Sequence, residues 1–170
     1  MATSLSVVNQ KLGYARVLLQ ELATPRLAQN DFLEAALADA VVAHLMCGFH
    51  QYLQELAYAN GIKPLTSIDS LGALQTIFIE ADVVSAEMDE LQQLSAESTS
   101  WLAHLYQAYE QQWALPDGNS TKLIPAPIDD ENLILLTAVE DAPDIQAQLR
   151  EWYNAFTDMV QRHRQNLAEY

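Results

Sequence analysis

The sequence predicts an all-α protein: an antiparallel four-helix bundle with additional short helices and one long proline-containing loop. Two observations carry this prediction. Apolar residues recur three or four positions apart through four long stretches, and that spacing places them on one face of a helix. The prolines fall between these stretches, where they end helices rather than break them. Because no two segments read as partnered strands, residues 1–170 are expected to form one helical domain.

The first helix is expected to run from Thr3 or Ser4 to Ala23. Its apolar positions alternate in steps of four and three, which is typical of a helix that packs along another helix. These positions are Leu5, Val8, Leu12, Ala15, Leu19 and Leu22. Pro25 ends the helix. The link to the next helix is short, so the two helices are expected to be antiparallel neighbours.

The longest helical signal extends from Asn30 to Gly61, and the fold is expected to form around it. Asn30 or Asp31 can cap its N-terminus by accepting a hydrogen bond from a free backbone N–H. Gly61, followed by Pro64, is typical of the position just after a helix end. The apolar face between these ends is broad. Its residues are Leu33, Leu37, Val41, Leu45, Phe49, Tyr52, Leu53 and Leu56.

Shorter helices are expected in the middle of the chain. The segment Thr66-Ser67-Ile68-Asp69 has the spacing of a capping box and is expected to open a helix through residues 71–78. A second short helix is expected over residues 86–95. A helix with a wide aromatic face then opens at Ser98 or Ser100 and ends in a proline turn.

The last part of the chain begins irregularly and ends in a clear helix. Residues 116–132 form the proline-containing loop, and the apolar run 133–139 is interpreted as helix or extended coil because it has no strand partner. Pro143 and Asp144 suit the first turn of a helix. The inward positions of that helix are Ile145, Leu149, Trp152, Phe156, Met159, His163 and Leu167.

Composition narrows the classes of function. Half of the residues are hydrophobic and 18% are charged, which favours a packed core over disorder. The formal net charge of -15 disfavours direct binding to nucleic acid and to anionic membranes. The single cysteine, Cys47, cannot form an internal disulfide, and we find neither a signal-peptide pattern nor a spanning segment. A cytoplasmic location is therefore expected.

Four groups of residues, in this order and spacing, carry a resemblance to a known family. They are Asn9-Gln10-Lys11-Leu12 with Ala15-Arg16; His44-Leu45; Ser100-Trp101-Leu102-Ala103 with Ala108-Tyr109; and Arg162-His163-Arg164 with Leu167, Glu169 and Tyr170. The chain resembles an uncharacterised family of short all-helical bacterial proteins, a domain of unknown function. The resemblance spans most of the chain and implies a helical fold. The family has no assigned activity, so the resemblance implies no catalytic residue.

Two histidines lie at or beside the apolar faces of their helices. His163 is at an inward position of the last helix, His44 lies next to apolar residues of the longest helix, and Asn9 and Arg16 are one heptad apart on the first helix. A buried neutral histidine needs a hydrogen-bond partner. We therefore expect a buried polar layer of these four residues that fixes the register of the helices. The alternative is that this layer binds a small ligand or transfers a proton.

Metal binding and catalysis are not favoured by the motifs. His44, Cys47 and His50 are suitable zinc or copper ligands by type. They fan over about 120° of one helix, so they do not converge on a single ion. Packing is the favoured interpretation, and no metal or cofactor is predicted. We find no nucleophile motif and no phosphate-binding loop, so no catalytic residue is predicted and an enzyme is not favoured.

The aromatic helix offers candidate binding residues. Its face is formed by Trp101, Tyr106, Tyr109 and Trp113. Core packing is the favoured interpretation, and a pocket or partner-binding groove is the alternative. Trp101 and Trp113 remain candidate binding residues, and Trp113 is expected to be exposed because it ends the helix beside the proline loop.

Negative charge is concentrated in the middle of the chain. Between residues 61 and 142 there are 14 Asp and Glu residues and 2 Lys residues, so -12 of the -15 falls there. Its simplest interpretation is a solvated surface that keeps the protein soluble, and its functional interpretation is a docking surface for a basic partner. The segments expected to dock such a partner are residues 80–97 and 129–141.

Two functional hypotheses follow. The first is a non-catalytic cytoplasmic helical protein that binds another protein, a basic one, through its acidic face. The alternative is a helical bundle that binds a small molecule or a metal, either as a binding protein or as an enzyme. It would use the layer of Asn9, Arg16, His44 and His163. Homodimerisation is left open by the sequence.

Overall fold

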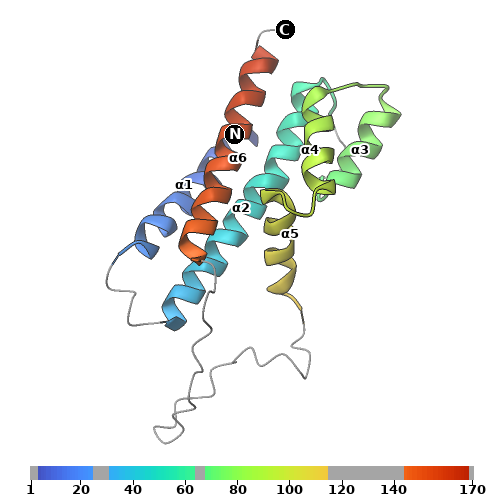
Figure 1. Ribbon diagram of the computed structural model, residues 1–170. Coiled ribbons are helices and arrows are strands. Elements are labelled where there is room, and N and C mark those ends of the chain that lie inside the picture. The colour runs from blue at the N-terminus through green and yellow to red at the C-terminus, as the bar shows by residue number, and fades with distance from the viewer. Residues whose placement is uncertain (1–3, 25–30, 64–67, 115–143, 169–170) are drawn as a thin grey trace, which may run out of the picture.

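A computed structural model of the protein describes residues 4–24, 31–63, 68–114 and 144–168. Within these ranges all regular secondary structure is helical, and no strand occurs (Figure 1). The prediction of an all-α chain is confirmed. The helices are α1 (Ser4–Leu22), α2 (Asp31–Ala59), α3 (Leu71–Glu80), α4 (Ala86–Ala96), α5 (Trp101–Gln111) and α6 (Ile145–Ala168).

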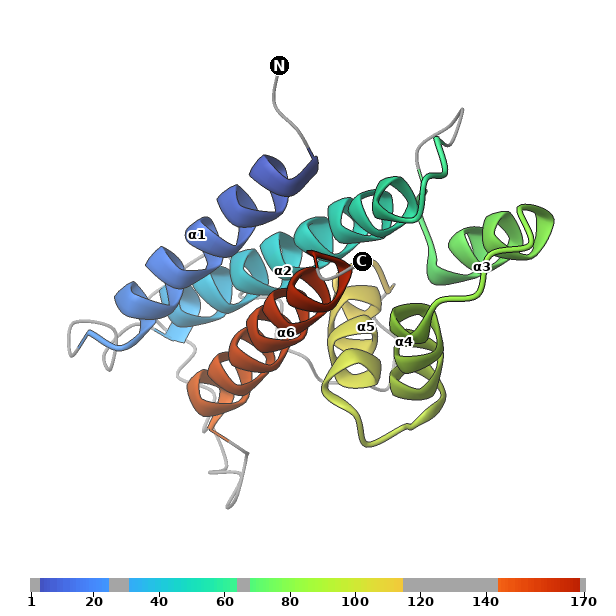
Figure 2. The same cartoon turned by 90° about the horizontal axis from the view of Figure 1, so that it is seen from above.

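Helix α2 lies at the centre of the molecule. Helix α1 runs antiparallel beside α2, and α6 contacts both of them (Figures 1 and 2). Helix α5 packs against α2 and α6, while α3 and α4 form a side layer in which α4 contacts α5. Since α5 has 11 residues and α2 has 29, α5 covers only part of the α2 surface. The first and last helices of the chain, α1 and α6, contact each other.

The predicted apolar faces of the first two helices form a large part of the core. On α1 the inward positions Val8, Leu12, Ala15, Leu19 and Leu22 are all buried. On α2 the buried face begins at Ala38, whereas Leu33 is exposed although its spacing places it on the predicted face. The reason is that apolar periodicity marks a helix face without showing how far along the helix its neighbours reach.

An aromatic cluster joins α2, α5 and α6 around Phe156. Trp101 of α5 stacks on Phe156 with ring centroids 5.8 Å apart. Phe49 of α2 lies 6.1 Å from Phe156 and 5.8 Å from Tyr106 of α5. Such offset and edge contacts stabilise a core beyond the area that they bury. Trp101 and Tyr106 therefore pack against the core, which is the interpretation that the sequence favoured for the aromatic face.

Three serines at equal spacing cap the N-termini of the side helices. The hydroxyls of Ser70, Ser85 and Ser100 accept hydrogen bonds from the third backbone N–H of α3, α4 and α5. These bonds satisfy donors that a helix N-terminus leaves free. Ser100 was one of the two predicted caps of α5. The predicted capping box at residues 66–69 lies partly outside the described residues, and Ser70 takes its place as the cap of α3.

Helices α2 and α3 end in the same hydrogen-bond pattern. At the end of α2, Gly61 has a positive φ of 75°, as predicted for this position, and Ile62 N donates to Ala57 O. At the end of α3, Asp82 takes that place with a φ of 53°, and Val83 N donates to Phe78 O. Both are Schellman motifs, in which glycine is the least strained residue. The chain thus places an acidic residue at an exposed turn where glycine is favoured.

Two predicted segments lie outside the described residues: the proline-containing loop at 116–132 and the apolar run at 133–139.

Helix α2 is apolar enough, by length and composition, to cross a membrane, with a mean hydropathy of 1.6 over an 18-residue window. The core helix of a soluble protein passes the same test. A signal sequence near the N-terminus passes it too. In this structure α1, α3, α5 and α6 all pack on α2.

Candidate functional site

Three consecutive residues near the end of α6 connect this helix to three others. We call Arg162, His163 and Arg164 the Arg-His-Arg clasp. Their side chains reach in different directions because successive residues of a helix are 100° apart. The periodicity of α6 turns His163 inward, so that its side chain is only 1% exposed, and leaves the two arginines on either side of the buried face.

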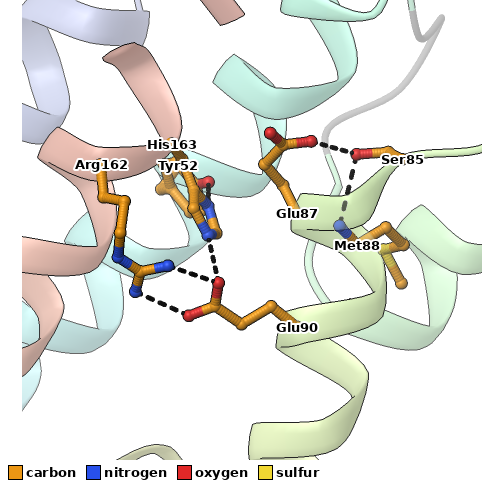
Figure 3. Close-up of polar contacts among 7 residues, drawn as sticks. All are labelled: Tyr52, Ser85, Glu87, Met88, Glu90, Arg162 and His163. Atoms are coloured by element: carbon orange, nitrogen blue, oxygen red, sulfur yellow. Dashed lines mark hydrogen bonds and ion pairs between the residues drawn. The ribbon is translucent and has the colours of Figure 1, made fainter. Parts of the chain in front are cut away.

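His163 uses both of its ring nitrogens. Its Nδ1 is hydrogen-bonded to the Tyr52 hydroxyl of α2, and its Nε2 lies 3.0 Å from Glu90 Oε2 of α4 (Figure 3). Burial raises the pKa of Tyr52 above its ordinary value, and the nearby carboxylates of Glu55, Glu87 and Glu90 raise it further. The phenol therefore keeps its proton. With a neutral imidazole, the Tyr52 O–H donates to Nδ1 and the Nε2–H donates to Glu90.

Arg162 fixes the carboxylate that receives His163. Its Nη1 and Nη2 donate to the two oxygens of Glu90 at 2.7 and 2.8 Å, the bidentate geometry of the strongest ion pairs. The hydrogen bond from Arg162, with a further one from His163, lowers the pKa of Glu90 from 4.5 to about 2. The same bond raises the pKa of Arg162. Glu90 is thus a carboxylate at all ordinary pH values.

Arg164 reaches the opposite side of α6. Its Nε and Nη2 donate to the carboxylate of Glu55 on α2 at 2.5 and 2.8 Å. Its Nη1 donates to Asn9 Oδ1 on α1 at 2.9 Å. The clasp therefore binds α4 through Arg162, α2 and α4 through His163, and α1 and α2 through Arg164.

A buried carboxylate, that of Glu87, lies close to the clasp at the start of α4. Glu87 is buried and accepts a hydrogen bond from Ser85 Oγ at 2.8 Å (Figure 3). Ser85 also accepts from Met88 N as the cap of α4. This arrangement stabilises the first turn of α4, the helix that presents Glu90 to α6.

The chemistry of this network is that of a structural connection. A Tyr–His–Glu chain can in principle move a proton. Tyr52 and His163 are each only 1% exposed, so no substrate reaches either side chain in this conformation. Their hydrogen bonds instead satisfy polar groups that would be costly to bury alone.

The prediction that Asn9, Arg16, His44 and His163 form one buried layer is wrong. Only His163 is buried; Asn9 and Arg16 are exposed, and His44 is half-buried. The heptad spacing puts Asn9 and Arg16 on one face of α1, but the inward positions belong to the buried apolar residues described above. Both residues line a groove between α1 and α6 together with Arg164. Their role in binding stays a prediction.

His44 has a different environment from His163. Its ring lies 5.2 Å from the Tyr14 ring in an edge-on arrangement. Partial burial lowers the pKa of His44, and Lys11 lowers it further. Cys47, three residues on, has an exposed thiol. Among the described residues no three His, Cys, Asp or Glu side chains gather closely enough to hold a metal ion.

The two tryptophans proposed as binding residues differ in exposure. Trp101 is half-buried in the aromatic cluster, whereas Trp113 is 74% exposed and contacts Tyr109 with ring centroids 6.1 Å apart. The prediction that Trp113 is exposed is confirmed. Its neighbouring residues from 115 onward lie outside the described part of the chain.

The sequence showed only part of this site. Tyr52 was assigned to an apolar face, and Glu55 and Glu90 have the pattern of ordinary surface carboxylates. The available signal was the triplet at residues 162–164, which places two cations beside an inward histidine and implies that carboxylates lie nearby. Which carboxylates those are depends on the tertiary packing of helices more than 70 residues apart in the chain.

These observations define a class: an all-α protein whose last helix is bound to three others by a polar clasp. The chain belongs to the Family of unknown function (DUF6586), whose model matches residues 1–170. The resemblance to an uncharacterised helical family is confirmed, while its bacterial origin stays a prediction. No curated protein matches the chain, and no solved structure does.

Replacing Tyr52 with phenylalanine is expected to lower the free energy of unfolding by about 1–3 kcal/mol, because buried Nδ1 of His163 loses its partner. Urea unfolding measures the change. Tyr106→Phe is the matched control, since that half-buried hydroxyl makes no hydrogen bond to the described residues; its effect should stay within about 0.5 kcal/mol. Equal effects of the two substitutions would contradict the role of the Tyr52 hydroxyl.

The ion pair of Glu90 predicts a pH dependence. Since folding lowers the pKa of Glu90 from 4.5 to about 2, its contribution is complete above pH 4.5 and is lost as the pH falls toward 2. The stability difference between the wild type and Glu90→Gln should therefore shrink over this interval. Thermal unfolding across it measures the difference, with Glu80→Gln on α3 as control. A stability difference between the wild type and Glu90→Gln that stays constant with pH would contradict the stabilising role of the Glu90 ion pair.

Proposed function

We propose that the protein is a non-catalytic, cytoplasmic binding protein that docks a basic segment of another protein on the surface formed by α3, the α3–α4 turn and α4. We call this surface the acidic edge. It consists of the exposed apolar residues Ile79 and Val84 with the exposed acidic residues Glu80, Asp82 and Asp89. The observation that carries the proposal is this combination of exposed apolar and uniformly acidic side chains.

The apolar part of the acidic edge is unusually exposed. Ile79 is 71% exposed and Val84 is 92% exposed. Between α3 and α4 they border a groove of about 150 Å³. The groove is lined by Gln75, Phe78, Ile79, Val83, Val84, Ser85, Met88, Asp89 and Gln92. Apolar side chains grouped around a groove and surrounded by polar residues are typical of a protein-binding surface.

The charge around this groove has one sign. Residues 68–114 contain eight Asp and Glu residues and neither Lys nor Arg. Of these eight, only Glu90 has an ion pair among the described residues, and its partner comes from α6. Asp82 keeps its carboxylate at a turn position where glycine would be less strained. The uncompensated field favours a cationic partner.

The occupant that fits is a basic amphipathic segment of another protein. An apolar side chain of such a segment would enter the groove between α3 and α4, and its Lys or Arg side chains would face Glu80, Asp82 and Asp89. Apolar burial would supply affinity, while charge complementarity would supply rate and selectivity. The second acidic stretch predicted to dock a partner, residues 129–141, lies outside the described residues.

Two supporting observations concern location and chemistry. The exposed thiol of Cys47 fits a reducing compartment. The only histidine that the structure places in a hydrogen-bond network, among the described residues, is enclosed by Tyr52 and Glu90 and has no access to a substrate. Both favour a cytoplasmic, non-catalytic protein.

The test uses a synthetic peptide whose helix carries leucine on one face and lysine on the other. Its affinity, measured by calorimetry at low salt, should fall about twofold to thirtyfold in a variant with Glu80→Gln and Asp89→Asn, since each exposed charge pair contributes about 0.2–1 kcal/mol. The control neutralises Glu151 and Asp158 on α6, which changes the net charge equally. Its affinity for the peptide should stay close to that of the wild type.

The apolar part is tested separately. Ile79→Ser together with Val84→Ser should weaken binding of the peptide, whereas Val17→Ser, an exposed apolar position on α1, should leave it unchanged. Equal losses in the two charge variants would contradict docking at the acidic edge. So would an affinity that stays constant up to about 0.5 M salt, where exposed charges are screened within a few ångströms.

A further inference from the structure

Helices α1 and α6 border a groove of about 250 Å³ on a different part of the molecule from the acidic edge. It is lined by Asn9, Leu12, Gly13, Arg16, Tyr153, Thr157, Val160, Gln161 and Arg164. In Figure 1, α1 and α6 lie on one side of α2, and α3 and α4 lie on the other. The groove and the acidic edge therefore occupy separate surfaces.

The charge of the groove is opposite to that of the protein. The chain has 23 Asp and Glu residues against 8 Lys and Arg residues, yet two arginines and no carboxylate line this groove. A cationic group in a recess attracts an anion more strongly than the same group on a flat surface, because the protein walls limit screening by solvent.

One arginine of the groove is held in place and the other is free to bind. The guanidinium of Arg164 is fixed by Glu55 and by Asn9 Oδ1. Since Asn9 Oδ1 accepts from Arg164, the amide nitrogen of Asn9 keeps its two donors, and these make no hydrogen bond to the described residues. Arg16 has no carboxylate partner within the described part of the chain. Arg16 and Asn9 therefore supply unused donors at one site.

The floor of the groove is apolar and open. Leu12 and Val160 are buried at its base. A Cβ added to Gly13 would meet no atom within 4 Å, which leaves room above the floor. The half-buried Tyr153 and the exposed amide of Gln161 complete the rim. A ligand that suits these walls has one anionic end and a short apolar body.

We propose that this groove binds a small organic anion through a carboxylate or phosphate group held by Arg16 and Asn9, with Arg164 as a positioned cation behind them. Arg guanidinium and amide N–H groups are the donors that proteins use for such groups. The proposed site keeps Asn9 and Arg16 as binding residues, as the sequence analysis predicted. It places them in an exposed groove instead of a buried layer, and it does not include His44 or His163.

The experiment titrates the full chain with sodium succinate and, separately, with sodium phosphate, and follows backbone and side-chain amide resonances by NMR. Saturable shifts are expected at Asn9, Gly13 and Gln161. Arg16→Gln should weaken the apparent Kd about tenfold, in line with the loss of a charge-assisted hydrogen bond. The control is Arg150→Gln, which removes an exposed arginine of α6 that does not line the groove. This variant should leave the Kd unchanged.

A second variant separates charge from shape. Gly13→Leu keeps both arginines and fills the groove, and the open space at Gly13 lets the helix accept it. Binding should be lost in this variant while the melting temperature is retained. Shifts that do not saturate, or that are equal in the wild type, Arg16→Gln and Gly13→Leu, mean an adventitious ion only and overturn the proposal. A response to succinate alone or to phosphate alone identifies the anionic group.

Discussion

The burial of one imidazole between two helices is the constraint on which the rest of the structure depends. His163 is enclosed on α6 and can satisfy both ring nitrogens only where Tyr52 of α2 and Glu90 of α4 are within reach at once. A buried polar group without a partner costs about 1–3 kcal/mol, so a shift of α6 by one turn is strongly disfavoured. One side chain thereby sets the register of α6 and the position of α4.

This constraint also organises the charge of the molecule. Arg162 neutralises Glu90 of α4, whereas the outward carboxylates of α3 and α4 have no cationic partner within the described part of the chain. Arg164 is neutralised by Glu55 but still lies behind the groove between α1 and α6. The two proposed binding surfaces therefore have opposite character, and they lie on opposite sides of α2 (Figure 1). An acidic protein can in this way keep one cationic recess.

Local signals allowed the helices to be predicted, and tertiary packing limited the prediction of the site. Periodicity identified α1, α2 and α6 closely, and the terminal glycine of α2 was recognised because a positive φ favours that residue. Asn9 and Arg16 were assigned to the interior because heptad spacing shows which residues share a face without showing which face turns inward. The partner of His163 on α2 is 111 residues away in sequence, and no local pattern indicates a hydrogen bond over such a separation.

The central claim is that the Arg-His-Arg clasp connects α6 to α4. Native-state hydrogen exchange of the wild type and of Arg162→Gln tests it most directly, because exchange reports the opening of each helix separately. The account predicts that the amides of α4 lose protection in the variant while those of α1 keep theirs. Unchanged protection of α4, or an equal loss in both helices, would contradict it.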